Sequence, residues 1–162
     1  MQKQNLYSME ELVPVMTSFF AEGKKVMVTA VGNSMLPLIR NRKDSIVLTA
    51  YEGSQLNIGD MVFYKRKDGK YVLHRIVDVA QDGSFIILGD NQTVTEKGIK
   101  KDQIIALPTA IIRGKKTVSV TSGEYLRYKK IWTRSVVLRK LHEKYFNLKN
   151  RIVKKFKRTF KI

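Results

Sequence analysis

The stretch VMVTAVGNSMLP, residues 26–37, joins a run of strand-forming residues to a turn that contains a serine. Valine and threonine favour extended backbone, and the Gly32-Asn33 pair that follows is typical of a turn. Ser34 is therefore predicted to lie at the end of a strand, beside a glycine that permits close approach of another backbone segment. A serine presented in this way is a candidate nucleophile.

Short β-rich runs continue from this stretch and predict a mainly β, antiparallel body. Turn clusters at Asp68-Gly69 and Gln81-Asp82-Gly83 connect successive runs as hairpins. Helical periodicity does not alternate with the runs, so a parallel sheet with crossover helices is not expected. The predicted strands cover residues 26–31, 45–50, 61–65, 70–80, 84–88, 104–112 and 117–120.

A short N-terminal helix is predicted before the β body. Ser8-Met9-Glu10-Glu11 has the pattern of a capping box, and apolar residues follow at helical spacing until Gly23. We therefore divide the chain into an N-terminal helix over residues 1–25, a β domain over residues 26–122 and a helical tail over residues 123–162.

Positive charge is concentrated in the tail. The chain has 31 Lys and Arg against 14 Asp and Glu, and residues 124–162 alone hold 14 basic and two acidic residues. Apolar residues recur in the tail at steps of three or four, which predicts a basic amphipathic helix. Its stripe either packs on the β body or meets an anionic membrane or a partner. Nucleic acid is not expected, because it cannot accommodate a continuous apolar stripe. The stripe consists of Leu138, Leu141, Tyr145, Leu148, Ile152 and Phe156.

Composition excludes several classes of site. The chain has no cysteine and only two histidines, so a thiolate or histidine-rich metal site is not expected, and no cofactor is implied. Its longest apolar run, residues 104–112, is too short for a bilayer-spanning helix. The first residues also lack the apolar core of a secretory signal. We expect a cytoplasmic or peripheral membrane protein.

His74 is a candidate base for Ser34. It lies in Tyr71-Val72-Leu73-His74-Arg75-Ile76-Val77, where strand alternation places it on one face with Val72 and Ile76. Its unperturbed pKa near neutrality suits proton transfer from a hydroxyl. Taken alone, a histidine in a strand more often has a half-buried structural role. The turn-rich stretch 89–98 supplies two carboxylates, Asp90 and Glu96, either of which could orient the imidazole.

Taken together, these motifs resemble the S24/S26 serine peptidase superfamily, and most closely the signal peptidase I of the endoplasmic-reticulum and archaeal type. The resemblance covers roughly residues 26–120. Its boxes are Gly32-Asn33-Ser34-Met35-Leu36-Pro37, Gly59-Asp60-Met61-Val62, Leu73-His74-Arg75-Ile76 and Gly89-Asp90-Asn91 with an acidic residue soon after. It implies a coiled antiparallel β-sheet of the signal-peptidase and LexA-like kind.

The resemblance also implies roles for the site residues. Ser34 would attack the peptide bond, His74 would transfer the proton, and Glu96 or Asp90 would orient the imidazole. The site residues implied around the serine, for the oxyanion and the substrate, are Gly32, Asn33 and Met35. The substrate would be an extended peptide or precursor protein.

Departures from the family pattern leave alternatives open. Gly32 stands where signal peptidases often have a serine that helps to stabilise the oxyanion, and Glu96 stands where the family's acid is usually Asp. The family's N-terminal membrane helix is not found, so we expect either that the basic tail replaces it or that the substrate is not a secretory precursor.

One alternative is a catalytically inactive peptide-binding module. Another is a LexA-like self-cleaving regulator. About 25 residues precede the β domain, too few for a separate helix-turn-helix domain. No Ala-Gly bond lies upstream of Ser34, and histidine replaces the lysine base of LexA-like proteins. These observations argue against the LexA-like alternative.

Overall fold

The computed structural model describes residues 8–159, except for the side chains of residues 136 and 154–159. Helix α1, Met9–Ala21, begins with the predicted capping box: Ser8 Oγ accepts a hydrogen bond from the Glu11 N–H at 3.3 Å, and Glu11 accepts one from the Ser8 N–H at 2.8 Å. Three apolar side chains of α1 are buried, namely Val13, Met16 and Phe20. The N-terminal helix therefore forms as predicted and packs on the sheet.

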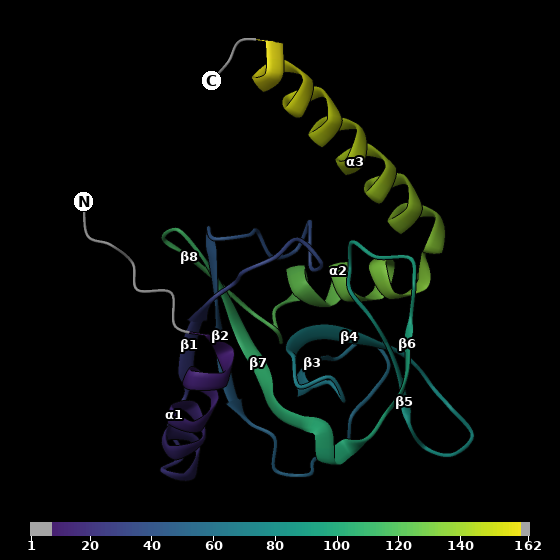
Figure 1. Ribbon diagram of the computed structural model, residues 1–162. Coiled ribbons are helices and arrows are strands. Elements are labelled where there is room, and N and C mark those ends of the chain that lie inside the picture. The colour runs from purple at the N-terminus through teal and green to yellow at the C-terminus, as the bar shows by residue number, and fades with distance from the viewer. Residues whose placement is uncertain (1–7, 160–162) are drawn as a thin grey trace, which may run out of the picture.

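Eight antiparallel strands form one sheet, which confirms the predicted fold class (Figure 1). Their order is β1-β2-β7-β3-β4-β5-β6, with β8 paired to β7. Strand β1 therefore lies at one end of the sheet, beside the loop that carries Ser34. The strands are β1 (Val26–Thr29), β2 (Asp44–Ala50), β3 (Met61–Lys65), β4 (Tyr71–Val79), β5 (Phe85–Leu88), β6 (Glu96–Ile99), β7 (Ile104–Arg113) and β8 (Lys116–Ser119), and a 3-10 turn, η1 (Lys101–Gln103), precedes β7.

The structure differs from the sequence prediction at two strands. Strand β1 ends at Thr29, two residues earlier than predicted. Strand β6 forms within the stretch that we predicted to be a turn-rich loop, and it pairs with β5 through Ile87↔Glu96 and Phe85↔Ile99. Glu96 is therefore held by a strand. Its sequence neighbours Lys97 and Gly98 have low strand propensity, so its pairing partner determines the conformation.

The two faces of the sheet pack separate apolar clusters. One cluster lies under α1 and includes Met16, Phe20 and Leu48. The other contains Val62, Tyr64, Ile76 and Ile87, among others. Strand β4 contributes to both, because successive side chains of a strand point to opposite faces. Leu73 packs on the cluster under α1, whereas Val72 packs on the other.

The tail forms two helices instead of the single one predicted. Helix α2, Gly123–Arg134, ends at Ser135, whose φ of −102° and ψ of 90° are not helical. Helix α3, Val136–Thr159, follows and extends away from the sheet (Figure 1). Among the described helices, none combines the length and the apolar composition needed to cross a bilayer.

Candidate active site

Ser34 lies in the loop between β1 and β2, and its carbonyl lies against the Gly89-Asp90-Asn91 turn. The Ser34 carbonyl accepts a hydrogen bond from the Asn91 N–H at 2.7 Å. A Cβ atom at Gly89 would lie 2.7 Å from the same carbonyl oxygen, so only glycine fits there. The Gly89-Asp90-Asn91 turn is thereby pressed against the serine, although the two segments are more than 50 residues apart.

Gly32 shapes the start of the serine loop. Its φ of +106° is readily adopted only by glycine. Its N–H donates to Asn41 Oδ1 at 3.0 Å and is therefore already bonded within the protein. Asn33 is exposed and its carbonyl accepts from the Leu36 N–H at 3.3 Å, while Met35 is buried. Of the three predicted oxyanion and substrate residues, Met35 and Gly32 also line the groove beside Ser34.

A groove of about 660 Å³ leads to Ser34 between α1, β1 and β4. Its lining is largely apolar and includes Leu73 of β4 as well as Ser34 itself. Large apolar side chains are unusually exposed along it: Val15 at 52%, Phe19 at 42%, Met27 at 62% and Val31 at 63%. Exposed apolar side chains that gather in one concave surface are typical of a binding site.

His74 projects from β4 into a buried polar cluster. The residue is 1% exposed, and its Nδ1 lies 3.3 Å from Glu96 Oε1 and 3.4 Å from the Tyr64 hydroxyl. The Tyr64 hydroxyl donates to Glu96 Oε2 at 3.0 Å. Arg66 donates through both Nε, at 2.7 Å, and a terminal nitrogen to the same carboxylate. A carboxylate beside Nδ1 favours the tautomer with its proton on that atom, which leaves Nε2 as an acceptor.

The environment keeps His74 neutral at ordinary pH. Burial lowers the pKa of His74 to about 4, although the charge of Glu96 acts in the opposite direction. Burial acts to raise the pKa of Glu96, but hydrogen bonds from Arg66 and Tyr64 outweigh it and lower that pKa below its usual value. A neutral imidazole beside an ionised carboxylate can accept a proton from a hydroxyl.

Asp90 lies in a separate cluster with Arg75, the residue that follows His74 on β4. Its carboxylate accepts a fork of two hydrogen bonds from Arg75, both at 2.8 Å, and a third from the Tyr128 hydroxyl at 3.0 Å. Its carbonyl accepts from Trp132 Nε1 at 2.8 Å. The carboxylate of Asp90 is therefore engaged by β4 and α2. Gln92 bonds the turn, accepting from the Gly89 N–H at 3.1 Å.

The structure thus separates the two predicted carboxylates. Glu96 faces His74, whereas the carboxylate of Asp90 is occupied by Arg75 and Tyr128. No hydrogen bond joins the Ser34 hydroxyl to His74 within residues 8–159, and of these two residues only Ser34 lines the groove. Catalytic hydrogen bonds are often long or unaligned before substrate binds.

Four polar residues of these clusters were not predicted from the sequence. Tyr64 and Arg66 contact Glu96, while Tyr128 and Trp132 reach the Gly89-Asp90-Asn91 turn from α2. The alternation of β3 places Tyr64 on the His74 face, because Val62 and His74 are paired across the strands. That pattern could have identified Tyr64, but it gives no signal for the distant α2 residues.

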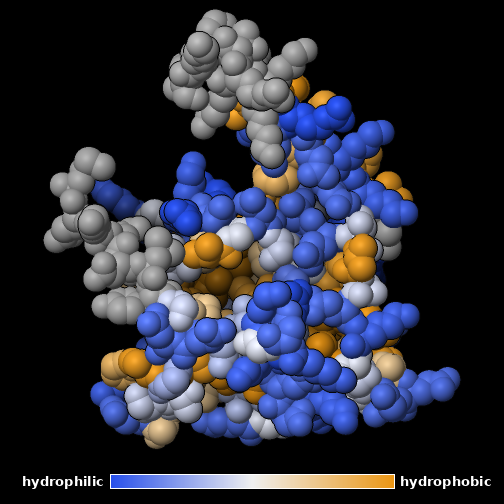
Figure 2. All heavy atoms as spheres, in the orientation of Figure 1, coloured by the Kyte–Doolittle hydropathy of each residue, from blue (hydrophilic) through white to orange (hydrophobic). Residues whose placement is uncertain are grey.

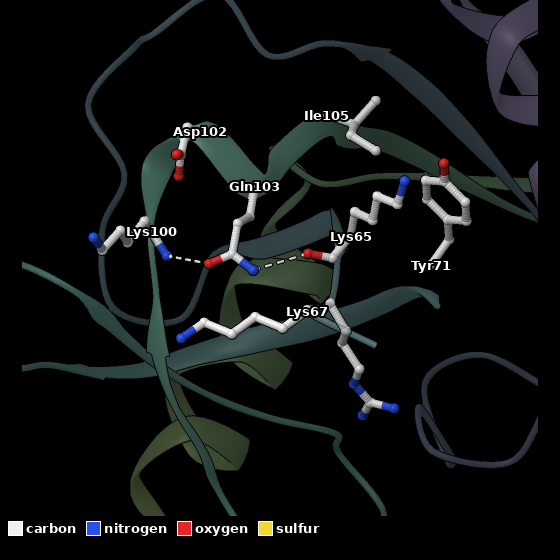
Figure 3. Close-up of a pocket in the computed structure, with 8 residues that line it drawn as sticks. Lys65, Lys67, Tyr71, Lys100, Asp102, Gln103 and Ile105 are labelled. Carbon is white, nitrogen blue, oxygen red and sulfur yellow. Dashed lines mark hydrogen bonds between the residues drawn. The ribbon is translucent and has the colours of Figure 1, made fainter. Parts of the chain in front are cut away.

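A second hollow of about 450 Å³ is basic (Figure 3). Lys65, Lys67 and Lys100 surround Gln103, which accepts from the Lys100 N–H at 3.0 Å and donates to the Lys65 carbonyl at 2.9 Å. Arg66, the partner of Glu96, lines the same hollow. Across the described part of the chain, no group of three or more His, Asp or Glu side chains is placed to hold a metal ion.

Comparison with models of protein families finds a match for the β domain. The family model for Peptidase S24-like proteins matches residues 2–112. This range contains Ser34, His74, Asp90 and Glu96 and ends before α2. No curated protein sequence matches the chain significantly.

Proposed function

The chain belongs to the peptidase S24-like family, and we propose that it is a serine endopeptidase of signal-peptidase type that cleaves peptides or precursor proteins. The observation that carries this proposal is the 3.3 Å approach of Glu96 to Nδ1 of the buried His74. Nε2 is then the imidazole atom left to accept the Ser34 proton, as in a Ser-His-acid site. Ser34 is held by its backbone at the end of an open groove, where a peptide can reach it.

In the proposed reaction each of these residues has one role. Ser34 Oγ attacks the scissile carbonyl carbon while its proton passes to His74 Nε2. The C–N bond then breaks, the imidazolium returns the proton to the leaving amine, and water hydrolyses the acyl-enzyme through the same base. Glu96 stabilises the transient imidazolium. With the Gly32 N–H bonded to Asn41, the Ser34 N–H is the proposed oxyanion donor, worth about 3 kcal/mol.

The groove supports an extended peptide with large apolar side chains as substrate. Strand β1 ends the sheet, so its outer edge can pair with the backbone of a bound peptide. Alternate side chains of that peptide would meet Met27 and Phe19, which are exposed in the groove. Met9, Met16 and Met35 also line it, and flexible thioethers adapt to apolar side chains of different shape.

A serine-directed fluorophosphonate probe tests the nucleophile. We expect the probe to label the full chain, and Ser34→Ala to abolish both labelling and hydrolysis of apolar peptides. Ser54→Ala is the matched control, because Ser54 is exposed and far along the chain from the site. Labelling that persists in Ser34→Ala would refute the assignment. A folded protein that binds peptides but is neither labelled nor active would instead be the catalytically inactive module.

Mass spectrometry of the intact chain distinguishes self-cleavage from cleavage of other polypeptides. We expect the intact mass of the purified chain to stay constant during incubation, while added peptide is cleaved. Fragments that appear in the wild type but not in Ser34→Ala would favour the LexA-like regulator.

A further inference from the structure

One face of helix α3 is used for contact with the body. Arg139 is buried and donates to the Thr133 carbonyl at 3.3 Å. His142 Nδ1 lies 2.9 Å from Asn91 Oδ1, and its ring packs edge-on against Trp132. Asn91 is also the residue whose N–H binds the Ser34 carbonyl. The beginning of α3 is therefore tied to the turn that supports the serine.

The other face of α3 exposes the apolar stripe that the sequence predicted. Packing on the β body would have buried this stripe, yet its described members are 41–63% exposed. Figure 2 shows apolar side chains along α3 interspersed with hydrophilic ones. Phe156, the last predicted member, lies outside the described side chains. The exposed members are Leu138, Leu141, Tyr145, Leu148 and Ile152.

Charge decides which partner fits the stripe. Residues 124–162 hold 14 basic and two acidic side chains. Two copies of α3 packed stripe to stripe would bring these charges together, which opposes self-association. An anionic bilayer complements both features, because its surface attracts Lys and Arg while the acyl boundary accepts the apolar stripe.

We propose that α3 binds in the plane of an anionic phospholipid bilayer, with the stripe from Leu138 to Ile152 entering the headgroup boundary. Exposed Lys144, Lys149 and Arg151 lie among the stripe residues and contact the lipid phosphates. The proposal is independent of the peptidase chemistry. Since His142 joins α3 to Asn91, the bound helix also fixes the Gly89-Asp90-Asn91 turn relative to the membrane.

Vesicle flotation of the full chain tests the proposal. We expect binding to vesicles of mixed phosphatidylcholine and phosphatidylglycerol, weakening as salt rises, and little binding to phosphatidylcholine alone. The double variant Leu141→Glu, Leu148→Glu should bind at least about tenfold more weakly. Both side chains are exposed, so thermal unfolding should be unchanged. Val94→Glu is the control, because Val94 is 81% exposed on the body.

A charge series separates the tail from the overall positive charge. We expect Lys144→Gln, Lys149→Gln and Arg151→Gln together to weaken binding about a hundredfold. Lys67→Gln, Lys97→Gln and Lys115→Gln remove the same charge from exposed positions on the body and should have far less effect. Equal losses in the two series, equal binding by the Leu141→Glu, Leu148→Glu variant, or no binding by the full chain would overturn the proposal.

Light scattering supplies the remaining outcome. We expect a monomer at all concentrations. A dimer that dissociates in the Leu141→Glu variant would assign the stripe to a second copy and overturn the membrane proposal. Ser34→Ala should float with the vesicles like the wild type. Failure of the proposed peptidase activity and failure of membrane binding are thereby distinguished.

Discussion

His74 and Arg75 are neighbours on β4, yet they belong to two ionic clusters with different properties. Arg75 and Asp90 are 0% and 1% exposed, and their charges are matched by a two-bond fork. Glu96 is shared among Arg66, Tyr64 and His74, and its side chain is 27% exposed. One cluster is sealed and the other is partly open to solvent. The alternation of a strand thus places a structural cluster and a titratable one back to back.

The difference shows how the fold keeps the site in place. Burial acts to lower the pKa of Arg75, but the charge and hydrogen bonds of Asp90, together with Tyr125, outweigh it and raise that pKa above its ordinary value, so this cluster keeps its charge. The sealed cluster holds the turn that contacts the Ser34 carbonyl. In the open cluster, Glu96 and Tyr64 contact Nδ1 of His74. These contacts leave Nε2 as the atom that can take up and release a proton.

The largest expected effect comes from breaking the sealed cluster. Asp90→Asn leaves the Arg75 guanidinium buried without a counter-charge, and we expect the free energy of unfolding to fall by about 3–5 kcal/mol. Urea denaturation measures it. Asp68→Asn is the control, because Asp68 pairs with Lys70 at an exposed site and should cost little.

The matching change in the open cluster should affect turnover instead. Glu96→Gln removes the carboxylate beside His74 Nδ1, and we expect kcat to fall about a hundredfold while stability changes by about 1 kcal/mol or less. Steady-state hydrolysis and urea denaturation on the same samples separate the two effects. Loss of turnover in Asp90→Asn alone, with Glu96→Gln fully active, would transfer the orienting role to Asp90.

Protonation of His74 should have an effect on stability that does not exceed that of Asp90→Asn. In the unfolded chain its pKa is near 6.5, and in the folded protein burial lowers the pKa to about 4. The unfolded state therefore binds this proton first as pH falls. The contribution of neutral His74 to the free energy of unfolding is therefore fully present above pH 6.5, and it decreases by about 3 kcal/mol as pH falls to about 4. Urea denaturation at the two pH values measures this decrease, and His74→Asn should remove it. If the variant loses as much stability between the two pH values as the wild type, the decrease does not come from His74.

The sequence predicted the parts of this arrangement that depend on local pattern. The hairpins β3–β4 and β4–β5 follow from their turn residues, and the alternation of β4 placed His74 with Ile76. Strand β6 was missed because its pairing with β5, not its own residues, makes it extended. Arg66 was missed because it follows β3, which is separated from β6 by two strands in the sheet order, so no local pattern indicates its contact with Glu96.

The C-terminal contacts could not be predicted for a related reason. The basic, apolar periodicity of residues 138–156 indicated a helix, and that periodicity says nothing about the break at Ser135. Tyr128 and Trp132 lie about 40 residues from Asp90 in the chain. Their contacts depend on how α2 packs against the body. The candidate acid was left open between Asp90 and Glu96 because both lie in the same turn-rich stretch, and the contact of Arg75 with Asp90 distinguishes them only in three dimensions.

The smallest expected effect concerns Arg66, which binds the carboxylate that faces His74. Its positive charge acts to lower the pKa of His74, and its hydrogen bonds occupy Glu96. Arg66→Gln removes both influences, so the pKa of His74 should rise from about 4 by about half a unit to one unit. The acid limb of the kcat/KM profile, which requires neutral His74, should move to higher pH by the same amount. Proton NMR of the imidazole gives a second readout that does not depend on activity, and His142→Gln assigns the two histidine signals. Lys67→Gln is the matched control, since Lys67 lines the same basic hollow but is not bonded to Glu96. If the two variants titrate alike, Arg66 does not hold the pKa of His74 down, and burial alone accounts for it.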